Sequence, residues 1–374
     1  MSMAVDVAVV GAGIVGASCA RELAREGLHV VTIDRGFIGC GATSAGMGHI
    51  VVMDDSEAQF ALTRYSQMLW DDLQPELPAE VEFDRTGTIW VASDHEEMDE
   101  VRRKFSYYGE RGVTTRILDA RELHEAEPHL RTPLAGGLLV PGDSVLYPPS
   151  AAAHLLNDAR SHGASLIFGQ SVVSIDRGNV SLSDGTVIHA ERVVNATGQV
   201  APLLTPGANV KPRKGHLVIT DRYPGLVRHQ LVELGYLKSA ASPSGESVAF
   251  NVQPRKTGQV LIGSSRQYDV TDTRGDAKIV ARMLERTFEY VPSLRSASSI
   301  RTWTGFRAAT PDKLPLIGPW PEDPSLILAT GHEGLGITTS LATGRLIADQ
   351  LFQRKSAIPI EPYLPSRQMT GAHA

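Results

Sequence analysis

The stretch Val9-Val10-Gly11-Ala12-Gly13-Ile14-Val15-Gly16-Ala17 lies almost at the start of the chain and decides its fold. An apolar strand runs into G-x-G-x-x-G, a helical pattern follows over 17–26, and Asp34 ends the next apolar run, His29-Val30-Val31-Thr32-Ile33. The glycines permit a tight turn and a close approach of backbone to a pyrophosphate, the helix N-terminus attracts that charge, and Asp34 can accept a ribose hydroxyl. This order predicts a dinucleotide site. The alternative is a glycine-rich turn in another α/β protein.

A second run of glycine and small residues follows Asp34, from Gly36 to His49. It would let a second length of backbone lie along an extended cofactor. FAD needs such a surface because a ribityl chain and a flavin extend beyond its pyrophosphate, whereas a nicotinamide dinucleotide rarely does. The sequence therefore favours FAD, with a flexible surface loop as the alternative.

The composition is ordinary for a soluble globular protein with room for two domains: 374 residues, 42% hydrophobic and 21% charged. The net charge of −6 and the absence of a basic block argue against nucleic acid as a partner. The apolar runs are of strand length, so we expect no transmembrane segment. Cys19 and Cys40 are the two cysteines, which provide no disulfide framework and no metal or iron–sulfur ligand set. We expect a cytoplasmic protein.

Periodicity predicts an α/β chain with a discontinuous domain organisation. The first βαβ unit is expected to end near 50–53, and short strands with hairpin turns at Gly178-Asn179 and Asp184-Gly185 begin at Ser165. Helices are expected over 56–73, 95–111, 150–161, 277–290 and 337–352. We predict a Rossmann-like FAD-binding domain over 1–82, 146–213 and 308–374, with an inserted mixed β-sheet substrate domain over 83–145 and 214–307.

Several blocks, taken together, resemble the D-amino acid oxidase (DAO) family of FAD-dependent amine oxidoreductases, which contains glycine oxidase, sarcosine oxidase and D-amino acid dehydrogenases. In the family order these blocks are Gly11–Gly16, Gly41–Gly46, Asn195–Gly198, Gly305–Asp312, Leu314–Pro319 and Ala329–Ile337. The versions over Gly46–His49 and His332–Ser340 are most similar to the catalytic (beta) subunits of D-hydroxyproline dehydrogenases and opine oxidases. The resemblance implies a glycine oxidase-like two-domain fold.

The resemblance also implies a reaction: hydride moves from the α carbon of a D-amino acid or secondary amino acid to flavin N5 and leaves an imine. D-Hydroxyproline or a proline-like compound is the expected substrate. Arg307 falls on the family's carboxylate arginine, and a guanidinium matches a carboxylate bidentately, although a salt bridge is the alternative. Tyr268, Tyr236 and His49 are the other candidate catalytic residues, with Arg266 beside Tyr268, and a structural role is the alternative for each.

The cofactor residues expected from the motifs and the resemblance come from five segments. The turn before the last helix can present N–H groups and a positive dipole to the flavin edge where negative charge accumulates. Relatives with covalent flavin attach it through a cysteine late in the chain, and none follows Cys40, so we expect noncovalent FAD. With two cysteines in the chain, we also expect no metal site. The residues are Gly11, Gly13, Ile14, Val15, Gly16, Asp34, Arg35, Gly41, Ala42, Thr43, Ser44, Gly46, Met47, Gly48, Val172, Ala196, Thr197, Gly198, Gly331, Gly334, Leu335, Gly336 and Ile337.

Four alternative functions are also compatible with the sequence. They are a glycine- or sarcosine-type oxidase that makes hydrogen peroxide, an opine oxidase subunit, a noncatalytic flavin-binding scaffold, and an NAD(P)-dependent dehydrogenase in which Arg35 contacts a 2′-phosphate. The NAD(P)-dependent dehydrogenase alternative does not explain the glycine-rich turn near the C-terminus. The likeness to multisubunit dehydrogenases implies partner subunits that carry a second flavin and an iron–sulfur cluster, because this chain has too few cysteines for one. Such a complex could associate peripherally with the inner membrane.

Overall fold

The computed structural model describes residues 2–235 and 246–370. The G-x-G-x-x-G stretch joins β1 (Ser2–Val10) to α1 (Ile14–Arg25). β1 pairs in parallel with strands on both sides, and its residues alternate between two core clusters: Val7 and Val9 face one, Ala8 and Val10 the other. A strand buried on both faces between parallel neighbours is typical of a Rossmann-like sheet covered on both sides.

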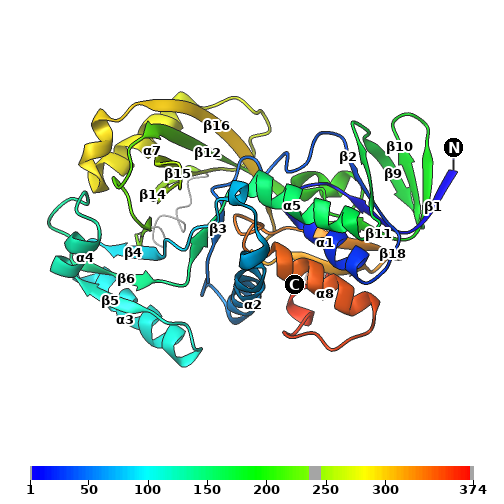
Figure 1. Ribbon diagram of the computed structural model, residues 1–374, viewed down its shortest axis with the longest axis horizontal. Helices are drawn as coiled ribbons and strands as arrows, with labels where there is room; N and C mark the ends of the chain where they lie inside the picture. Colours follow the sequence, from blue (N-terminus) through cyan, green and yellow to red (C-terminus); the bar gives the residue numbers. More distant parts are fainter. Residues whose placement is uncertain (1, 236–245, 371–374) are drawn as a thin grey trace.

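The sheet that contains β1 gathers segments from the whole length of the chain (Figure 1). Helices α1, α5 (Pro148–Ser161) and α8 (Ser340–Leu351) contribute to the core on one face. The hairpin of β9 (Val172–Asp176) and β10 (Asn179–Leu182) pairs with β11. In sheet order the other strands are β17 (Leu316–Trp320), β18 (Asp323–Thr330), β11 (Val187–Asn195), β1, β2 (Val30–Asp34) and β8 (Ser165–Phe168).

A second, mixed sheet forms the other half of the molecule (Figure 1). Helix α7 (Ala277–Tyr290) packs against β14 and β15, while α3 (His95–Glu110) and α4 (Ala120–Ala126) lie near its other end. In sheet order the strands are β16 (Ser299–Ala309), β12 (Lys211–Arg222), β15 (Gln259–Gln267), β14 (Glu246–Pro254), β13 (Gln230–Glu233), β4 (Thr88–Ala92), β6 (Gly136–Val140) and β5 (Arg116–Asp119).

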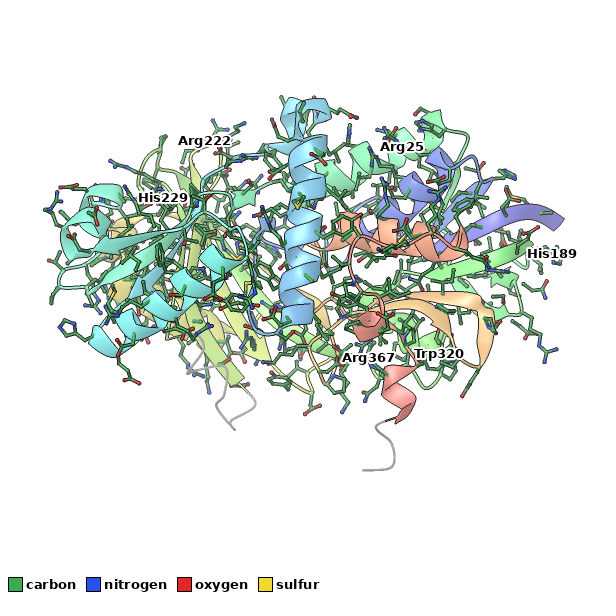
Figure 2. All side chains as sticks on the ribbon, turned by 90° about the horizontal axis from the view of Figure 1, so that it is seen from below. Arg25, His189, Arg222, His229, Trp320 and Arg367 are labelled. Atoms are coloured by element: carbon green, nitrogen blue, oxygen red, sulfur yellow. The ribbon has the colours of Figure 1, made fainter. Side chains whose placement is uncertain are left out.

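Helix α2 (Glu57–Leu73) lies between the two halves. Figure 2 shows it with His229 on the side of the second sheet and His189 and Trp320 on the side of the first. The hydroxyl of Ser56 caps its N-terminus by accepting from the Gln59 N–H at 3.1 Å. Near the other end, the indole N–H of Trp70 donates to the carbonyl of Ile337 at 3.3 Å. The helix therefore holds the turn that precedes α8.

The structure corrects several sequence-based expectations. The apolar residues at 187–188 and 193–194 belong to one strand, β11 (Val187–Asn195), and α8 begins at Ser340 instead of 337. The segment near 50–53 does not complete the βαβ unit, because β3 (His49–Ile50) leaves the main sheet and pairs with β7 (Ser144–Val145). The second parallel strand of the βαβ unit is β2. The run of glycine and small residues from Gly36 to His49, the second glycine loop, follows it.

The predicted domain boundaries at 213/214 and 307/308 fall inside β12 and β16, both of which belong to the second sheet. The exact division of the chain into domains stays a prediction. Within the described ranges, no helix has both the length and the apolar character needed to cross a membrane.

Candidate active site

A cavity of about 820 Å³ runs from the carboxyl ends of β1 and β2 to one face of the second sheet. Val10, Gly11, Ile33 and Asp34 line it at the first end, the position where open α/β sheets bind ligands. Its size lies in the upper part of the usual range for ligand sites, about 300–1,000 Å³.

The end near β1 is built from close backbone contacts. Gly11 has φ +112°, and a Cβ there would lie 2.6 Å from the carbonyl oxygen of Ala196. The Asp34 carboxylate accepts from the N–H groups of Ala12 and Gly36, each at 2.7 Å. Asp34 therefore ties the first glycine loop to the start of the second, while it also lines the cavity where a ribose is expected.

The second glycine loop is fixed from both halves of the molecule. Gln253 on β14 donates from Nε2 to the carbonyl of Met47 at 2.7 Å, and Thr338 donates from Oγ1 to the carbonyl of His49 at 2.8 Å. Gly48 has φ +98°, and a Cβ there would lie 2.0 Å from the carbonyl oxygen of Leu146. Only glycine fits at that crossing, and the loop runs along the cavity as an ordered backbone surface.

The structure brings most of the expected cofactor residues to the cavity wall and leaves three outside it. Gly16 packs α1 onto β1, since a Cβ there would lie 1.9 Å from the Gly11 carbonyl oxygen. Ser44 is exposed and donates to the Gly41 carbonyl at 3.1 Å. Gly331 has φ +81° and packs near Thr310, so it shapes the turn instead of lining the cavity.

Arg307 lies at the far end of the cavity, on edge strand β16. Its Nη1 donates to the Ser265 carbonyl at 3.0 Å, and its Nε would lie 3.5 Å from a Cβ on Gly334, in the turn before α8. Burial, followed by the charge of Arg213, lowers the pKa of Arg307 to about 10. The guanidinium is thus a half-buried cation that an anion would stabilise, and it adjoins the turn expected at the flavin.

Arg213 lies directly opposite Arg307 in the register of β12 and β16, and it has its own counter-charge. It forms an ion pair with Glu333, whose N–H bonds to the Ala308 carbonyl at 2.9 Å. Arg213 also contacts Tyr268, with 3.4 Å between Nη1 and the phenol oxygen. Burial raises the pKa of Tyr268, but the hydrogen bond and charge of Arg213 outweigh this and leave the pKa below its usual value. Glu333 thus neutralises the positive charge of Arg213. This ion pair does not balance the positive charge of Arg307.

Three histidines line the cavity, and burial lowers the pKa of each. In His216, Nδ1 lies 2.9 Å from the Ser265 hydroxyl and Nε2 accepts from the Asp276 N–H at 3.0 Å.

Burial lowers the pKa of His49 to about 4, and its Nε2 has no hydrogen-bond partner within the described ranges. Burial lowers the pKa of His332 to about 3, with Nε2 lying 3.0 Å from the Thr343 hydroxyl. His49 contacts the side chain of Gln253, and its Nε2 is the atom that a ligand could meet. Tyr236, another predicted site residue, lies outside the described residues.

Sequence reasoning missed a polar set on the floor of the cavity. Three buried side-chain atoms there have no hydrogen-bond partner among residues 2–235 and 246–370: Trp90 Nε1, Gln230 Oε1 and Asn251 Oδ1. Buried polar atoms are normally paired, so these are candidates for contacts with water or ligand. The available signal was a polar residue inside each apolar strand pattern, as in Ala-Phe-Asn-Val over 249–252.

The cavity offers polar groups to an organic ligand and not a set of metal ligands. In the part of the chain that the structure describes, no group of three or more His, Cys, Asp or Glu residues could hold a metal ion. Cys19 and Cys40 are free thiols, and Cys40 lies beside Asp34 at 3.5 Å. The cysteines are thus near the dinucleotide end and far in sequence from Arg307.

The residues fit FAD, on the evidence of the backbone cradle at Gly11 and Gly48 and the continuous cavity from Asp34 to Arg307. The first glycine loop would hold the pyrophosphate, Asp34 the ribose, and the two later glycine segments the flavin. When bound, FAD would supply a two-electron acceptor at the end where Arg307 lies.

Comparisons with known proteins agree with this geometry. Over 379 residues the chain is 30% identical to glycine oxidase from Geobacillus kaustophilus, with 97% of each chain covered. It is 28% identical to hydrogen cyanide synthase subunit HcnC from Pseudomonas aeruginosa, covering 98% of this chain and 97% of the relative.

Solved structures extend the match to the whole fold. The G. kaustophilus glycine oxidase superposes with a TM-score of 0.88, covering 98% of this chain and 99% of that one. L-Proline dehydrogenase from P. horikoshii gives 0.89 at 25% identity, with 99% of each chain covered. Iminodiacetate oxidase from Chelativorans sp. BNC1 gives 0.81 at 26% identity, covering 96% of this chain and 98% of that one.

The family description "DAO: FAD dependent oxidoreductase" matches residues 6–350, nearly the whole chain. This match sets aside the NAD(P) alternative and agrees with the FAD cradle described above. The protein belongs to the DAO family of FAD-dependent oxidoreductases.

Proposed function

We propose that the protein oxidises the carbon–nitrogen bond of an α-amino acid, with a D-amino acid or a secondary amine such as a proline-like compound or D-hydroxyproline as substrate. The observation that carries the proposal is Arg307, a half-buried guanidinium beside Gly334 at the flavin end of the cavity. A substrate carboxylate that pairs with it would place the adjacent α carbon next to the expected flavin site.

The charges around Arg307 favour the form of the substrate that reacts. The carbon–hydrogen bond breaks with its electron pair passing to the flavin, and the amine loses a proton to become an imine. Positive charge from Arg307 and Arg266 disfavours an ammonium nearby and so lowers the substrate amine's pKa. The neutral His49 adds no charge that would oppose this effect.

The relatives support the substrate class. Their names are glycine oxidase, L-proline dehydrogenase and iminodiacetate oxidase, which are all named for small amine-bearing acids. The proline name supports a cyclic secondary amine in particular.

We further propose that electrons leave through partner subunits and that the protein works in the cytoplasm, peripherally at the inner membrane if its complex is bound there. The relative named as a subunit supports a multisubunit assembly. The second candidate function is an oxidase that passes electrons to oxygen and makes peroxide, which the 30% identity to a glycine oxidase favours.

The decisive experiment is anaerobic mixing of the FAD-loaded protein with D- and L-amino acids, sarcosine, cis- and trans-hydroxyprolines and opines. We expect at least one amino acid to reduce the flavin, measured as loss of its visible absorbance, at a rate no slower than catalytic turnover. A flavin that none of them reduces, but dithionite does, would contradict the proposal. Turnover of the best substrate with oxygen and with an artificial dye then separates the oxidase from the dehydrogenase.

A further inference from the structure

The polar floor of the cavity is arranged around one apolar side chain, Val232. In the register of the second sheet, Val232 on β13 lies between Asn251 on β14 and Trp90 on β4. Gln230 lies two residues before Val232 on the same strand. Residues directly across from each other, and residues two apart on one strand, face the same side of a sheet. All four line the cavity, so three polar side chains surround an apolar one on a single face.

The floor adjoins the loop at which the flavin is expected. Asn251 pairs with Gly263 on β15, and a Cβ on Gly263 would lie 3.0 Å from Sδ of Met47, in the second glycine loop. From Gly263 the row of paired residues continues through Asn251 and Val232 to Trp90. Neighbouring strands are about 4.8 Å apart, so the row extends roughly 14 Å from the loop.

Arg307 would hold the other end of an amino acid close to this row. Its Nη1 donates to the carbonyl of Ser265 at 3.0 Å, and Ser265 lies two residues after Gly263 on β15. Asn251 is on the next strand, directly across from Gly263. A substrate whose carboxylate pairs with Arg307 could therefore extend its side chain over the floor.

The floor presents one hydrogen-bond donor and two acceptors. Gln230 is 3% exposed, Trp90 is 5% exposed, and Asn251 is half-buried. Trp90 Nε1 can only donate, whereas Gln230 Oε1 and Asn251 Oδ1 accept, and none of these atoms has a partner within residues 2–235 and 246–370. A buried polar atom without a partner is destabilising, so the three atoms are complementary to a ligand group with one acceptor and two donors.

The floor carries no charge that would favour an ionised group. Lys104 lies 4.7 Å from the centroid of the Trp90 ring, but it forms an ion pair with Asp54, and neither residue of that pair lines the cavity. A carboxylate or an ammonium placed over Val232 would lose its water without gaining a counter-charge from the floor. The site therefore fits a neutral group.

We propose that the side chain of the substrate ends in a carboxamide bound at this floor, with Trp90, Gln230 and Asn251 as specificity-determining residues. The carboxamide oxygen accepts from Trp90 Nε1, and its two N–H groups donate to Gln230 Oε1 and Asn251 Oδ1. This inference rests on the proposed function and narrows its D-amino acid class to substrates of the asparagine or glutamine type. A carboxylate has no hydrogen to donate to the two amide oxygens, and an alkyl group leaves all three atoms unpaired.

The test compares amino acids of matched shape. Anaerobic flavin reduction is measured for D-asparagine against D-aspartate and D-leucine, and for D-glutamine against D-glutamate. We expect the amide to have the highest kcat/KM in at least one set. D-Alanine, whose methyl group is too short to reach the floor, corrects for a general loss of activity. In Asn251→Leu and in Gln230→Leu, the ratio of amide to D-alanine kcat/KM should fall about 10- to 100-fold, because a buried N–H group of the substrate loses its acceptor.

The matched control is Asn157→Leu, because Asn157 is exposed on α5 and lies outside the cavity lining; its ratio should match the wild type. Should both floor variants fail to bind FAD, Trp90→Phe carries the test, since it removes the N–H donor and keeps an aromatic ring; its ratio should also fall. Binding measured through the flavin spectrum adds a comparison without turnover, in which succinamate should bind more tightly than isocaproate, the leucine analogue without an amine.

Amides that react no faster than their matched partners, or an amide ratio that the floor variants leave unchanged, would overturn this inference and leave the proposed function intact. A flavin reduced by no amino acid of any kind would overturn the proposed function, and the inference with it.

Discussion

The guanidinium of Arg307 lies over Gly215, so that a Cβ on Gly215 would stand 2.6 Å from Nη1 and 3.0 Å from Cζ. Gly215 pairs with Gly305 across β12 and β16, two residues from the Arg213–Arg307 pair. A Cβ on Gly305 would in turn lie 2.4 Å from the Cβ of Ala45, in the second glycine loop. Two facing glycines therefore let the arginine and the cofactor loop approach the same patch of sheet.

Replacing Gly215 with alanine should displace Arg307 from this patch. We expect kcat/KM for the best amino acid to fall about tenfold or more, because a charged hydrogen bond is worth roughly 1.5–3 kcal/mol, while FAD remains bound. Steady-state kinetics and the flavin spectrum check this. Gly109→Ala is the matched control, since nothing lies within 4 Å of its added methyl group. Unaltered kinetics in Gly215→Ala would show that Arg307 does not need this position.

Asp34 should matter for FAD and not for the amino acid. Asp34→Ala removes the acceptor of the Ala12 and Gly36 N–H groups, so the two loops should loosen and the Kd for FAD should rise about tenfold or more. Fluorescence titration of the apoprotein with FAD measures this. Asp99→Ala, at a side chain 75% exposed, serves as the control. Equal FAD affinity in both variants would remove Asp34 from the binding site.

FAD should be held without a covalent bond. Neither Cys19, which is buried in α1, nor Cys40, beside Asp34, lies at the Arg307 end of the cavity. Acid precipitation is expected to release the yellow colour into the supernatant. Colour that stays with the pellet would refute this expectation and point to a covalent link that these residues do not explain.

His332 should make stability depend on pH. Burial lowers its pKa from 6.5 to about 3, so between these values the unfolded chain binds a proton that the native protein does not. Its contribution is fully present above pH 6.5 and is lost as the pH falls toward 3, by about 2 kcal/mol at about pH 5.

The measurement is the Tm with saturating FAD at about pH 7.5 and about pH 5. His332→Gln should lose less Tm between these two conditions than the wild type, whereas the exposed His129→Gln should follow the wild type. Equal losses in His332→Gln and the wild type would mean that the histidine is protonated in the folded protein.

The dinucleotide-binding half of the molecule was predictable from the glycine motifs, because the close approach of two backbone segments at Gly11 requires glycine. The place of Arg307 in the cavity wall was predictable from its motif, and its role stays a prediction. The polar floor was not predictable, because Gln230 and Asn251 reach the same cavity wall only when β13 and β14 pair, and no local sequence pattern encodes that pairing. The start of α8 was also missed, because the apolar residue Ile337 continues the helical period while its backbone still forms the turn that lines the cavity.

The central claim is that Arg307 binds the carboxylate of an amino acid as it reduces the flavin. The most direct measurement is anaerobic flavin reduction by the fastest amino acid and by its methyl ester, in the wild type and in Arg307→Ala. The account predicts that Arg307→Ala slows the acid about 10- to 100-fold at limiting concentration and brings it close to the ester, whose rate changes little. Equal slowing of acid and ester, or no slowing of either, would contradict it.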